Sequence, residues 1–380
     1  MKILYVYSKR ANALQYFRQY MPMILMRRIY PEIESASVST HDEGMPDVIT
    51  MKPEELNEFQ IVSYLRQITY DMDYNRKTID FLHYHDKKII FDIDDWWRVP
   101  RNHISFDAYK KTNLTAITED VLSRVDAVTT TTEYLAVKIY PFNKNVYILP
   151  NAIDPEEVQF KQRKIESSFI RFGWAGGVHH LPDIEIMRDS LKKAHFLPNI
   201  QLFIGGFNTG SDIYIEMEKI FTDNYRFLRD DKNYLEYLSK FTPVMEHISF
   251  DKPYRRLWGR DIYTYADIYN NFDVVLAPLE DNNFNHRKSE LKLIEAGTMG
   301  KAVIASAIPP YSDIIEHGVD GFLVSPFRNH IDWFIFMKRY VENPQLIKEH
   351  AANLSKKIAE KFDIYKINEK RKQIYFDILK

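Results

Sequence analysis

The sequence predicts an α/β protein of two domains, each built on a parallel β-sheet. Short apolar runs rich in β-branched residues alternate with stretches that have helical spacing of apolar residues. Such runs are Lys2–Tyr7 and Lys88–Asp92 in the first half, and Val274–Pro278 and Ala302–Ser306 in the second. Strands that alternate with helices form parallel sheets. The 380 residues also match the usual length of two domains.

Composition excludes several classes of protein. Hydrophobic residues make up 45% and charged residues 27% of the chain, which is typical of globular domains. The net charge of −2 gives no overall attraction to nucleic acid or acidic lipid. The chain has no cysteine, so disulfides and cysteine-ligated metal sites are excluded. It opens directly into a strand-like run, and no apolar run approaches the length of about 18 residues that a membrane span needs. We therefore expect a cytoplasmic protein.

The first half begins with the strand Lys2–Tyr7, followed by a helix that ends at about Arg28. The end of this helix, Met21–Arg28, is apolar and basic, so it could dock the protein on the inner surface of the membrane. An apolar helix side of this kind is more often part of the core. Residues 31–58 are polar and contain three prolines and a glycine, so they are expected to be mostly loop. A strand at Phe59–Tyr64 and a helix at Asp71–His85 follow.

Acidic and aromatic residues follow the strand Lys88–Asp92. Asp94, Asp95 and Trp96 stand where an α/β active site opens, outside the carboxyl end of a strand. We predict catalytic roles for the two carboxylates and contact with a substrate for Trp96. The structural alternative is an aspartate that caps the next helix.

The two predicted domains meet near the middle of the chain. Strand patterns at Asp126–Thr132 and Asn145–Leu149 lead to the turn Pro150–Asp154, and the charged stretch Pro155–Ser168 reads as a linker. The first domain is expected to cover residues 1–165 and the second domain residues 166–361.

The second domain opens with the strand Phe169–Trp174, two glycines and a helix at Asp183–Ala194. Gly176 and Gly177 would let the backbone approach a diphosphate or sugar, and a helix start favours an anion. A lone Gly-Gly is weak evidence. His180 either binds a phosphate or the acceptor, or is a capping or solvated histidine.

The later elements of the second domain are less regular in pattern. We expect a strand at Gln201–Ile204, a short strand at Ile248–Phe250 and a helix at Tyr263–Asn270, whereas residues 207–247 match no motif. Helices are expected at Ile331–Glu342 and Pro344–Lys361.

Charged residues cluster where the helix after Val274–Pro278 begins. Lys288 and Lys292 beside the free N–H groups of a helix start would suit a diphosphate. Glu295, one turn later, is placed to accept ribose hydroxyls. The segment therefore outlines a nucleotide-sugar site, and the alternative is an ordinary strand–helix–strand unit with a solvated charged helix start.

The same segment carries a resemblance to a known family. The run IEAGTMGKAVIAS, with Glu295, resembles the donor-binding core of GT-B glycosyltransferases of the retaining family 4, also called glycosyl transferases group 1. That family typically has a second Glu eight positions earlier, where this chain has Arg287. A subgroup with "KS.LK..E" is more similar, and Lys288, Ser289, Lys292 and Glu295 match its motif.

The resemblance implies a GT-B fold, in which two Rossmann-like domains face a cleft and a C-terminal helix (here 362–380) packs back on the first domain. It implies transfer from a nucleotide diphosphate sugar, with a UDP-sugar favoured, to a glycan or lipid-linked glycan, with retention and with no metal or other cofactor. The expected donor-binding residues are Gly176, Gly177, His180, Arg255, Lys288, Ser289, Lys292 and Glu295. Asp94, Asp95, Lys288 and Lys292 are expected to be catalytic, and Asn12, Tyr16, Arg18 and Trp96 to bind the acceptor. For Arg18, a surface position on an amphipathic helix stays an equal alternative.

Two other functions stay open. A GT-B enzyme that glycosylates hydroxymethylated bases in DNA would need a basic stripe, for which the candidates are Lys9, Arg10, Arg98, Arg101, Lys110 and Lys111. A non-catalytic sugar-nucleotide-binding protein is the third reading. The spelling Asp92-Ile93-Asp94 also suggests the metal motif of GT-A enzymes, which we reject because those chains lack the donor segment.

Overall fold

The computed structural model describes residues 1–7, 13–39, 48–208, 210–222, 254–327 and 330–380. The chain forms two compact units. Unit 1 comprises Met1–Asp154, His286–Ser289 and Phe362–Lys380, and unit 2 comprises Pro155–Asn285 and Glu290–Lys361. Within the described ranges, no helix combines the length and apolar character that crossing a bilayer requires.

Unit 1 is built on a six-stranded sheet in the order β2-β1-β3-β4-β5-β6, in which every pairing is parallel. Its strands are β1 (Lys2–Tyr7), β2 (Glu34–Ser39), β3 (Ile61–Leu65), β4 (Lys88–Ile93), β5 (Ala127–Thr130) and β6 (Val146–Ile148). Its helices are α1 (Ala13–Gln15), the π-helical turn η1 (Tyr16–Tyr20), α2 (Met21–Ile29), η2 (Val48–Thr50), α3 (Pro53–Asn57), α4 (Met72–Tyr84), α5 (Phe106–Lys111), α6 (Leu114–Arg124), α7 (Glu133–Ile139) and α16 (Ile364–Ile378).

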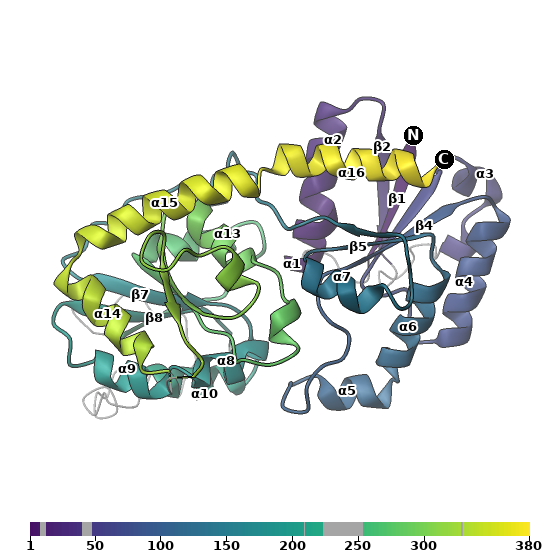
Figure 1. Cartoon of the computed structure of the whole chain (residues 1–380). Coiled ribbons are helices and arrows are strands. Elements are labelled where there is room, and N and C mark those ends of the chain that lie inside the picture. The colour runs from purple at the N-terminus through teal and green to yellow at the C-terminus, as the bar shows by residue number, and fades with distance from the viewer. Residues whose placement is uncertain (8–12, 40–47, 209, 223–253, 328–329) are drawn as a thin grey trace. The chain divides into compact units, whose positions relative to one another are not determined.

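Alternation along β1 divides the core of unit 1 into two layers, because successive side chains of a strand point to opposite faces. Leu4 and Val6 pack with residues of α4, α6 and α7. Ile3 and Tyr5 pack on the other face with residues of α2 and α16. Figure 1 shows α2 and α16 beside β1 and β2.

The second unit repeats this plan, with a parallel sheet in the order β12-β11-β10-β7-β8-β9. Its strands are β7 (Ile170–Ala175), β8 (Ile200–Phe207), β9 (Tyr254–Trp258), β10 (Val274–Ala277), β11 (Ala302–Ser306) and β12 (Phe322–Val324). Its helices are η3 (Val158–Phe160), η4 (Val178–His180), α8 (Leu181–Glu185), α9 (Arg188–Ala194), α10 (Ile213–Thr222), η6 (Tyr265–Asn271), η7 (Asn285–Arg287), α13 (Leu291–Thr298), η8 (Tyr311–Asp313), α14 (Asp332–Glu342) and α15 (Gln345–Lys361). These two parallel sheets with their helices confirm the predicted α/β class.

Several elements differ from the sequence prediction. The polar stretch Glu34–Ser39 is the edge strand β2 rather than loop, and an edge position places less demand on apolar side chains. The helix expected at Asp183–Ala194 is split into α8 and α9. The helix expected at Tyr263–Asn270 is the 3₁₀ helix η6, and Tyr254–Trp258 forms the edge strand β9. The strand expected at Ile248–Phe250 lies outside the described residues, as do residues 223–247. Earlier in the stretch that matched no motif, Ile213–Thr222 forms α10.

Candidate functional site

The residues singled out in the sequence fall into two groups, one at the carboxyl edge of each sheet. In unit 2 this edge carries the loops that follow β7, β10 and β11. In unit 1 it carries the loops that follow β3 and β4. Ligands of open parallel sheets bind outside these strand ends.

The turn after β7 is a tight glycine turn held from two sides. The Gly176 N–H donates to the Gly205 carbonyl at 3.2 Å, and the Tyr214 hydroxyl donates to the Gly176 carbonyl at 3.2 Å. A Cβ placed on Gly176 would lie 2.7 Å from the Trp174 ring, whereas one on Gly177 would meet no atom of the described residues within 4 Å. Among the described residues, the backbone at Gly177 therefore borders open space, as a turn that admits a ligand requires.

His180 is fixed by a carboxylate that the sequence analysis did not single out. Its Nδ1 lies 2.7 Å from Oδ2 of Asp183, the third residue of α8. The Asp183 side chain is buried, and its Oδ1 accepts from the Glu280 N–H at 2.9 Å and from Asn285 Nδ2 at 2.7 Å. Asp183 therefore joins the start of α8 to the loop after β10.

Glu295 on α13 is buried and hydrogen-bonded to two tyrosines of η6. Tyr265 donates to Oε1 at 2.8 Å, and the Tyr269 hydroxyl donates to Oε2. Lys292 lies 3.7 Å from Glu295 Oε2. A carboxylate offers about four lone-pair positions, so the two tyrosines leave capacity for further hydroxyl groups. The proposed contact with ribose stays a prediction.

A second acidic residue sits directly before α13. Burial raises the pKa of Glu290 to about 7, with Lys361 acting weakly in the opposite direction. One of its carboxylate oxygens is buried with no hydrogen-bond partner. Sequence reasoning noted the charge of Glu290 but gave it no role, because its burial follows from packing and not from local spacing.

Arg255 lies on β9, with its guanidinium 5.6 Å from the centre of the Phe203 ring. Burial, and secondarily Arg171, lowers the pKa of Arg255 from its ordinary value. Its neighbour Arg256 is fully buried and pairs with Glu218, so of the two only Arg255 is partly exposed.

In unit 1, two carboxylates face one arginine at the end of β4. Arg66, from the loop after β3, lies 3.2 Å from Asp95 Oδ2 and 3.8 Å from Asp94 Oδ1. Burial raises the pKa of Asp94 to about 6, although Arg66 opposes the shift. A carboxyl group with a pKa near the working range can take up and release a proton. The predicted catalytic role of Asp94 is consistent with this environment but stays a prediction.

Two cations of unit 1 lie near the Trp96 ring. The guanidinium of Arg287 is 4.7 Å from the ring centre, and the Lys138 ammonium is 5.9 Å from it. Cation–π contacts of this kind hold an aromatic ring in one orientation. Within the same unit, Asn151 Nδ2 donates to the Ser289 hydroxyl at 3.0 Å, and Lys288 is partly buried.

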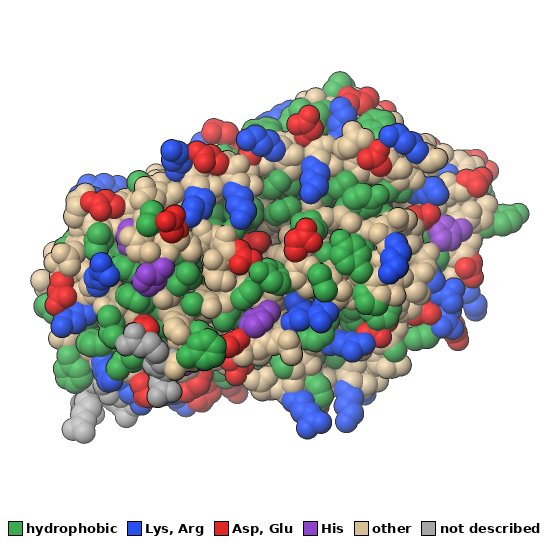
Figure 2. Space-filling model, viewed as in Figure 1, with side chains coloured by type: hydrophobic (Ala, Val, Ile, Leu, Met, Phe, Trp, Pro, Cys, Tyr) green, Lys and Arg blue, Asp and Glu red, His purple; other side chains and the backbone are tan. Residues whose placement is uncertain are grey.

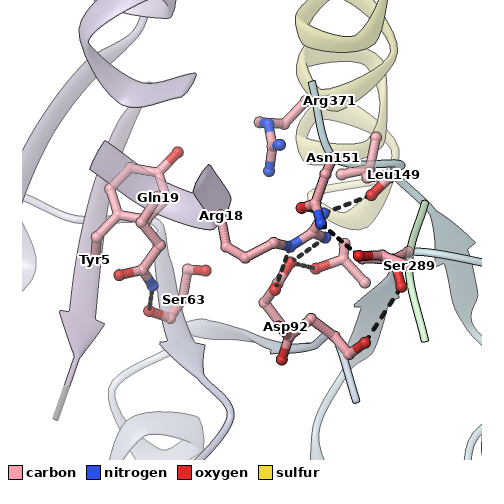
Figure 3. Close-up of polar contacts among 12 residues, drawn as sticks. Tyr5, Arg18, Gln19, Ser63, Asp92, Leu149, Asn151, Ser289 and Arg371 are labelled. Carbon is pink, nitrogen blue, oxygen red and sulfur yellow. Dashed lines mark hydrogen bonds and ion pairs between the residues drawn. The ribbon is translucent and has the colours of Figure 1, made fainter. Parts of the chain in front are cut away.

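Arg18 is buried, so the alternative of a surface position on an amphipathic helix is wrong, and its contact with an acceptor stays a prediction. It is 1% exposed, and its guanidinium forms two bonds of 2.8 Å to the oxygens of Asp92 (Figure 3). It also donates to the Leu149 carbonyl at 2.7 Å and to Asn151 Oδ1 at 3.1 Å. These interior partners, rather than solvent, surround its charge in this structure. Tyr16 is likewise buried, and Asn12 lies outside the described residues.

The Arg18–Asp92 ion pair gives the first aspartate of the Asp92-Ile93-Asp94 run a structural role. Both oxygens of Asp92 are held by Arg18, and Oδ2 also accepts from Thr129 Oγ1 at 2.6 Å. Asp92 thus serves the interior of unit 1, whereas Asp94 faces the loop after the strand. Among the described residues, acidic and histidine side chains form no cluster of three or more that would hold a metal ion.

The candidate basic stripe is only partly described. Arg98 pairs with Glu119 at 2.7 Å, and Arg101, Lys110 and Lys111 are exposed on or near α5. Figure 2 shows basic side chains projecting where Figure 1 places α5. Lys9 and Arg10 lie outside the described residues.

One protein family matches part of the chain by sequence. Residues 249–336 match the family described as "Glycosyl transferases group 1". The match includes Lys288, Ser289, Lys292 and Glu295, together with Arg255. No curated protein matches the chain significantly.

Solved structures match nearly the whole chain. HepE of Anabaena, solved with UDP and glucose, has a TM-score of 0.65 and 14% identity over 99% of this chain and 100% of its own. Sucrose-phosphate synthase of Thermosynechococcus elongatus has a TM-score of 0.64 and 14% identity over 99% and 98%. The lipopolysaccharide outer core galactosyltransferase WaaB has a TM-score of 0.57 and 14% identity over 99% and 99%. The chain therefore has the predicted GT-B fold.

Proposed function

We propose that the chain is a glycosyltransferase that uses a UDP-sugar as donor, because it carries a segment that matches glycosyl transferases group 1 on the GT-B fold. The acceptor we propose is a hydroxyl group of a glycan or lipid-linked glycan. The match over residues 249–336 carries the proposal, because that segment includes Lys288, Lys292 and Glu295, for which we predict contacts with the donor. Solved structures of HepE contain UDP and UDP-glucose, and WaaB is a lipopolysaccharide galactosyltransferase.

In the proposed mechanism the donor binds at the carboxyl edge of the unit 2 sheet. The open side of Gly177 admits the diphosphate and sugar, and Glu295 accepts hydrogen bonds from ribose hydroxyls. Lys292 and Lys288 offset the negative charge that grows on the leaving diphosphate. The lysines and the helix start supply positive charge where other enzymes use a metal ion, so we propose metal-independent transfer.

The acceptor is proposed to bind on unit 1, at the loop after β4. Trp96 offers an aromatic face to a sugar ring, and Asp94, whose pKa of about 6 lies close to neutrality, accepts the proton of the attacking hydroxyl. The resemblance to family 4 supports retention of the anomeric configuration.

A thermal-shift screen against UDP, GDP, ADP, CMP and their sugar conjugates tests the proposal. A ligand at 100 times its Kd stabilises the folded state by about 2.7 kcal/mol, so UDP and one UDP-sugar are expected to raise Tm clearly. Lys288→Ala should lose most of this shift, and the matched variant Lys348→Ala, at an exposed lysine of α15, should keep it.

Turnover with the stabilising donor completes the test. Glycan, lipid-linked glycan and DNA with hydroxymethylated bases serve as acceptors, with and without EDTA, and NMR of the product reports the anomeric configuration. Transfer to DNA alone would replace the proposed acceptor. Binding of the sugar nucleotide without transfer or hydrolysis would favour a non-catalytic sugar-nucleotide-binding protein. An absence of both binding and turnover would overturn the proposal.

A further inference from the structure

Arg66 follows β3 and faces the two carboxylates at the end of β4. We infer that Arg66 is a positioning residue that gives Asp94 and Asp95 different roles: it binds Asp95 by a hydrogen bond and leaves Asp94 as the group that accepts the proton of the attacking hydroxyl. The inference rests on the proposed function. It deepens that function, because the sequence predicts the same catalytic role for both carboxylates.

The backbone at Arg66 has a conformation that few residues with a side chain adopt. Its φ is +61°, in the left-handed region, where the Cβ atom is crowded. Such a conformation persists where the surrounding structure determines it, and it is concentrated at functional sites. The Arg66 N–H donates to the Asp92 carbonyl at 2.7 Å, which ties the residue after β3 to β4, two positions before Asp94. The turn therefore fixes the point from which the guanidinium reaches both carboxylates.

The two carboxylates differ in their contact with this guanidinium. Nη2 of Arg66 donates to Asp95 Oδ2 at 3.2 Å. Nη1 lies 3.8 Å from Asp94 Oδ1, which is too long for a hydrogen bond. Among the described residues, Asp94 Oδ1 is buried without a hydrogen-bond partner, yet the side chain as a whole is 20% exposed. Asp94 thus keeps capacity to accept a proton, and its exposed part makes it accessible to a substrate.

Arg66 and Asp95 act on the pKa of Asp94 in opposite directions. Burial raises this pKa to about 6, while the Arg66 charge lowers it and Asp95 raises it. Burial also raises the pKa of Tyr109 on α5 above its ordinary value of 10.0, so this phenol is neutral near pH 6. The charge of Arg66 therefore helps Asp94 to release its proton below neutral pH, as a proton acceptor requires. The titratable groups that act on Asp94 are Arg66, Asp95, Tyr109, and the opposing pair Arg18 and Asp92.

Two isosteric substitutions separate the carboxylates. The measurement is kcat/KM against pH, with the donor and acceptor that the turnover screen identifies, because its fall toward acid reports the pKa of a base in the free enzyme. In Asp94→Asn we expect kcat/KM to drop by about 100-fold or more and the acidic fall near pH 6 to disappear. In Asp95→Asn the acidic fall should remain and move to lower pH by about one unit, because a group that raises the pKa of Asp94 is gone.

Two further substitutions test the guanidinium itself. Glutamine removes the charge of Arg66 and lysine keeps it, and both are unbranched at Cβ like arginine, so the backbone at this position is equally strained. In Arg66→Gln the acidic fall should move to higher pH by about one unit or more, so that activity lost at pH 6 returns at about pH 8. In Arg66→Lys it should stay near that of the wild type.

The matched control is Arg124→Gln. Arg124 pairs with Asp120 at 3.1 Å with 38% of its side chain exposed. It ends α6 just before β5 begins at Ala127, so it lies at the amino edge of the sheet, opposite to Asp94. The variant loses the same charge from the same unit, and its pH profile should match that of the wild type.

NMR of the free protein measures the pKa of Asp94 without turnover. Protein labelled with ¹³C at the aspartate carboxyl groups is titrated from about pH 4 to about pH 9, and the resonance missing in Asp94→Asn identifies Asp94. Its pKa should be about 6 in the wild type and should move in each variant in the same direction as the acidic fall of kcat/KM. A purely structural role of Arg66 would lower kcat/KM at every pH and move neither quantity.

Two results would overturn the inference. An acidic fall and an Asp94 pKa that stay in place in Arg66→Gln would remove the positioning role. Loss of the acidic fall in Asp95→Asn, with its retention in Asp94→Asn, would assign proton uptake to Asp95. If Arg66→Gln fails to fold, the two aspartate variants still decide which carboxylate takes the proton. A wild type that turns over no sugar nucleotide fails the proposed function, and the NMR titration then still shows whether Arg66 controls Asp94.

Discussion

At the scale of single residues, Arg18 holds a positive charge inside unit 1 with Asp92 as its counter-ion. Removal of one partner from a buried ion pair leaves an uncompensated charge and costs about 3–5 kcal/mol. We expect Arg18→Met to lower the free energy of unfolding of unit 1 by an amount of this order. Urea denaturation followed by circular dichroism measures it.

The matched control is Arg98→Met. Arg98 forms a pair of similar length with Glu119, at 2.7 Å, but its side chain is 55% exposed. Exposed pairs contribute about 0–1 kcal/mol. Equal losses in the two variants would mean that the Arg18–Asp92 pair is not the feature that stabilises this region.

Asp94 makes the stability of unit 1 depend on pH. Its pKa is about 6 in the folded protein against an ordinary value of 3.8, so between these values the folded state binds the extra proton. Stability therefore falls as pH rises from about 4 to about 6. Asp94→Asn removes this dependence, because the amide does not titrate. From pH 4 to pH 6 we therefore expect the unfolding free energy of the variant to rise relative to that of the wild type.

Denaturation of both proteins at pH 4, 5, 6 and 7 measures this difference. A constant difference across the series would show that Asp94 ionises in the folded state at its ordinary value. Comparison with the variant at each pH cancels the titration of other carboxylates.

Sequence reasoning singled out residues by their local position, and their roles stay predictions. Asp94, Asp95 and Trp96 follow an apolar strand, and the end of a strand is visible in the sequence. It missed Asp183 and Arg66, because their partners lie far away in the chain. Asp183 contacts Glu280, 97 residues later, and no spacing rule joins the two. For Arg18 the sequence showed a helical position, but it did not show that Asp92 is the counter-ion of the buried guanidinium.

At the scale of elements, the turn after β7 distinguishes a glycine needed for ligand space from one needed for folding. Gly177 has extended backbone angles, φ −97° and ψ 171°, and no atom of the described residues lies within 4 Å of the place of its Cβ. Gly177→Ala should therefore fold normally, with a gain of about 0.4–1 kcal/mol from the less flexible unfolded chain. Affinity for the UDP-sugar should fall by about tenfold, because the methyl group occupies the donor's space.

The contrasting variant is Gly206→Ala at the end of β8. Gly206 has φ +87°, and a Cβ there would lie 2.7 Å from the Gly176 carbonyl oxygen. This variant should lose more than about 1 kcal/mol of stability. Thermal denaturation measures the stability of each variant, and calorimetry measures its affinity for the UDP-sugar. Unaltered donor binding in Gly177→Ala would show that the donor does not bind at this turn.

The elements that the sequence predicted are those with buried apolar runs, such as β4, β7, β10 and β11. The strand β2 was not predicted because its sequence ESASVS is mostly polar and lacks an apolar run. Its place at the edge of the sheet makes such a sequence possible. In η6, Tyr265 and Tyr269 both donate to Glu295 of α13. These contacts join residues that are 30 and 26 positions apart, so local spacing does not display them.

At the scale of the whole molecule, unit 1 is assembled from segments that are far apart in the chain. The Tyr375 hydroxyl of α16 lies 2.9 Å from the Tyr5 hydroxyl of β1, and Ile364, Ile367 and Ile374 are buried with it. Burial of each such side chain contributes about 1.5–3 kcal/mol. Truncation before Phe362 should therefore destabilise unit 1 by several kcal/mol and leave unit 2 nearly unaffected.

Hydrogen exchange with mass spectrometry tests this at peptide resolution. Peptides from β1, β3 and β4 should lose protection in the truncated protein, and peptides from β7, β10 and β11 should keep it. The exposed substitution Lys370→Ala on α16 serves as a control. Equal loss of protection in both units would contradict their independence.

The split composition of unit 1 also bears on its biosynthesis. The ribosome makes β1 to β6 first, yet α16, which covers Ile3 and Tyr5, emerges only after all of unit 2. Domains usually fold in the order in which they are made. Here α2 covers part of the apolar face that holds Ile3 and Tyr5, and the part that α16 covers stays exposed in the nascent chain while the second unit folds. Chaperones that bind exposed apolar segments are thus expected to engage this chain near its N-terminus and to be released when translation reaches α16.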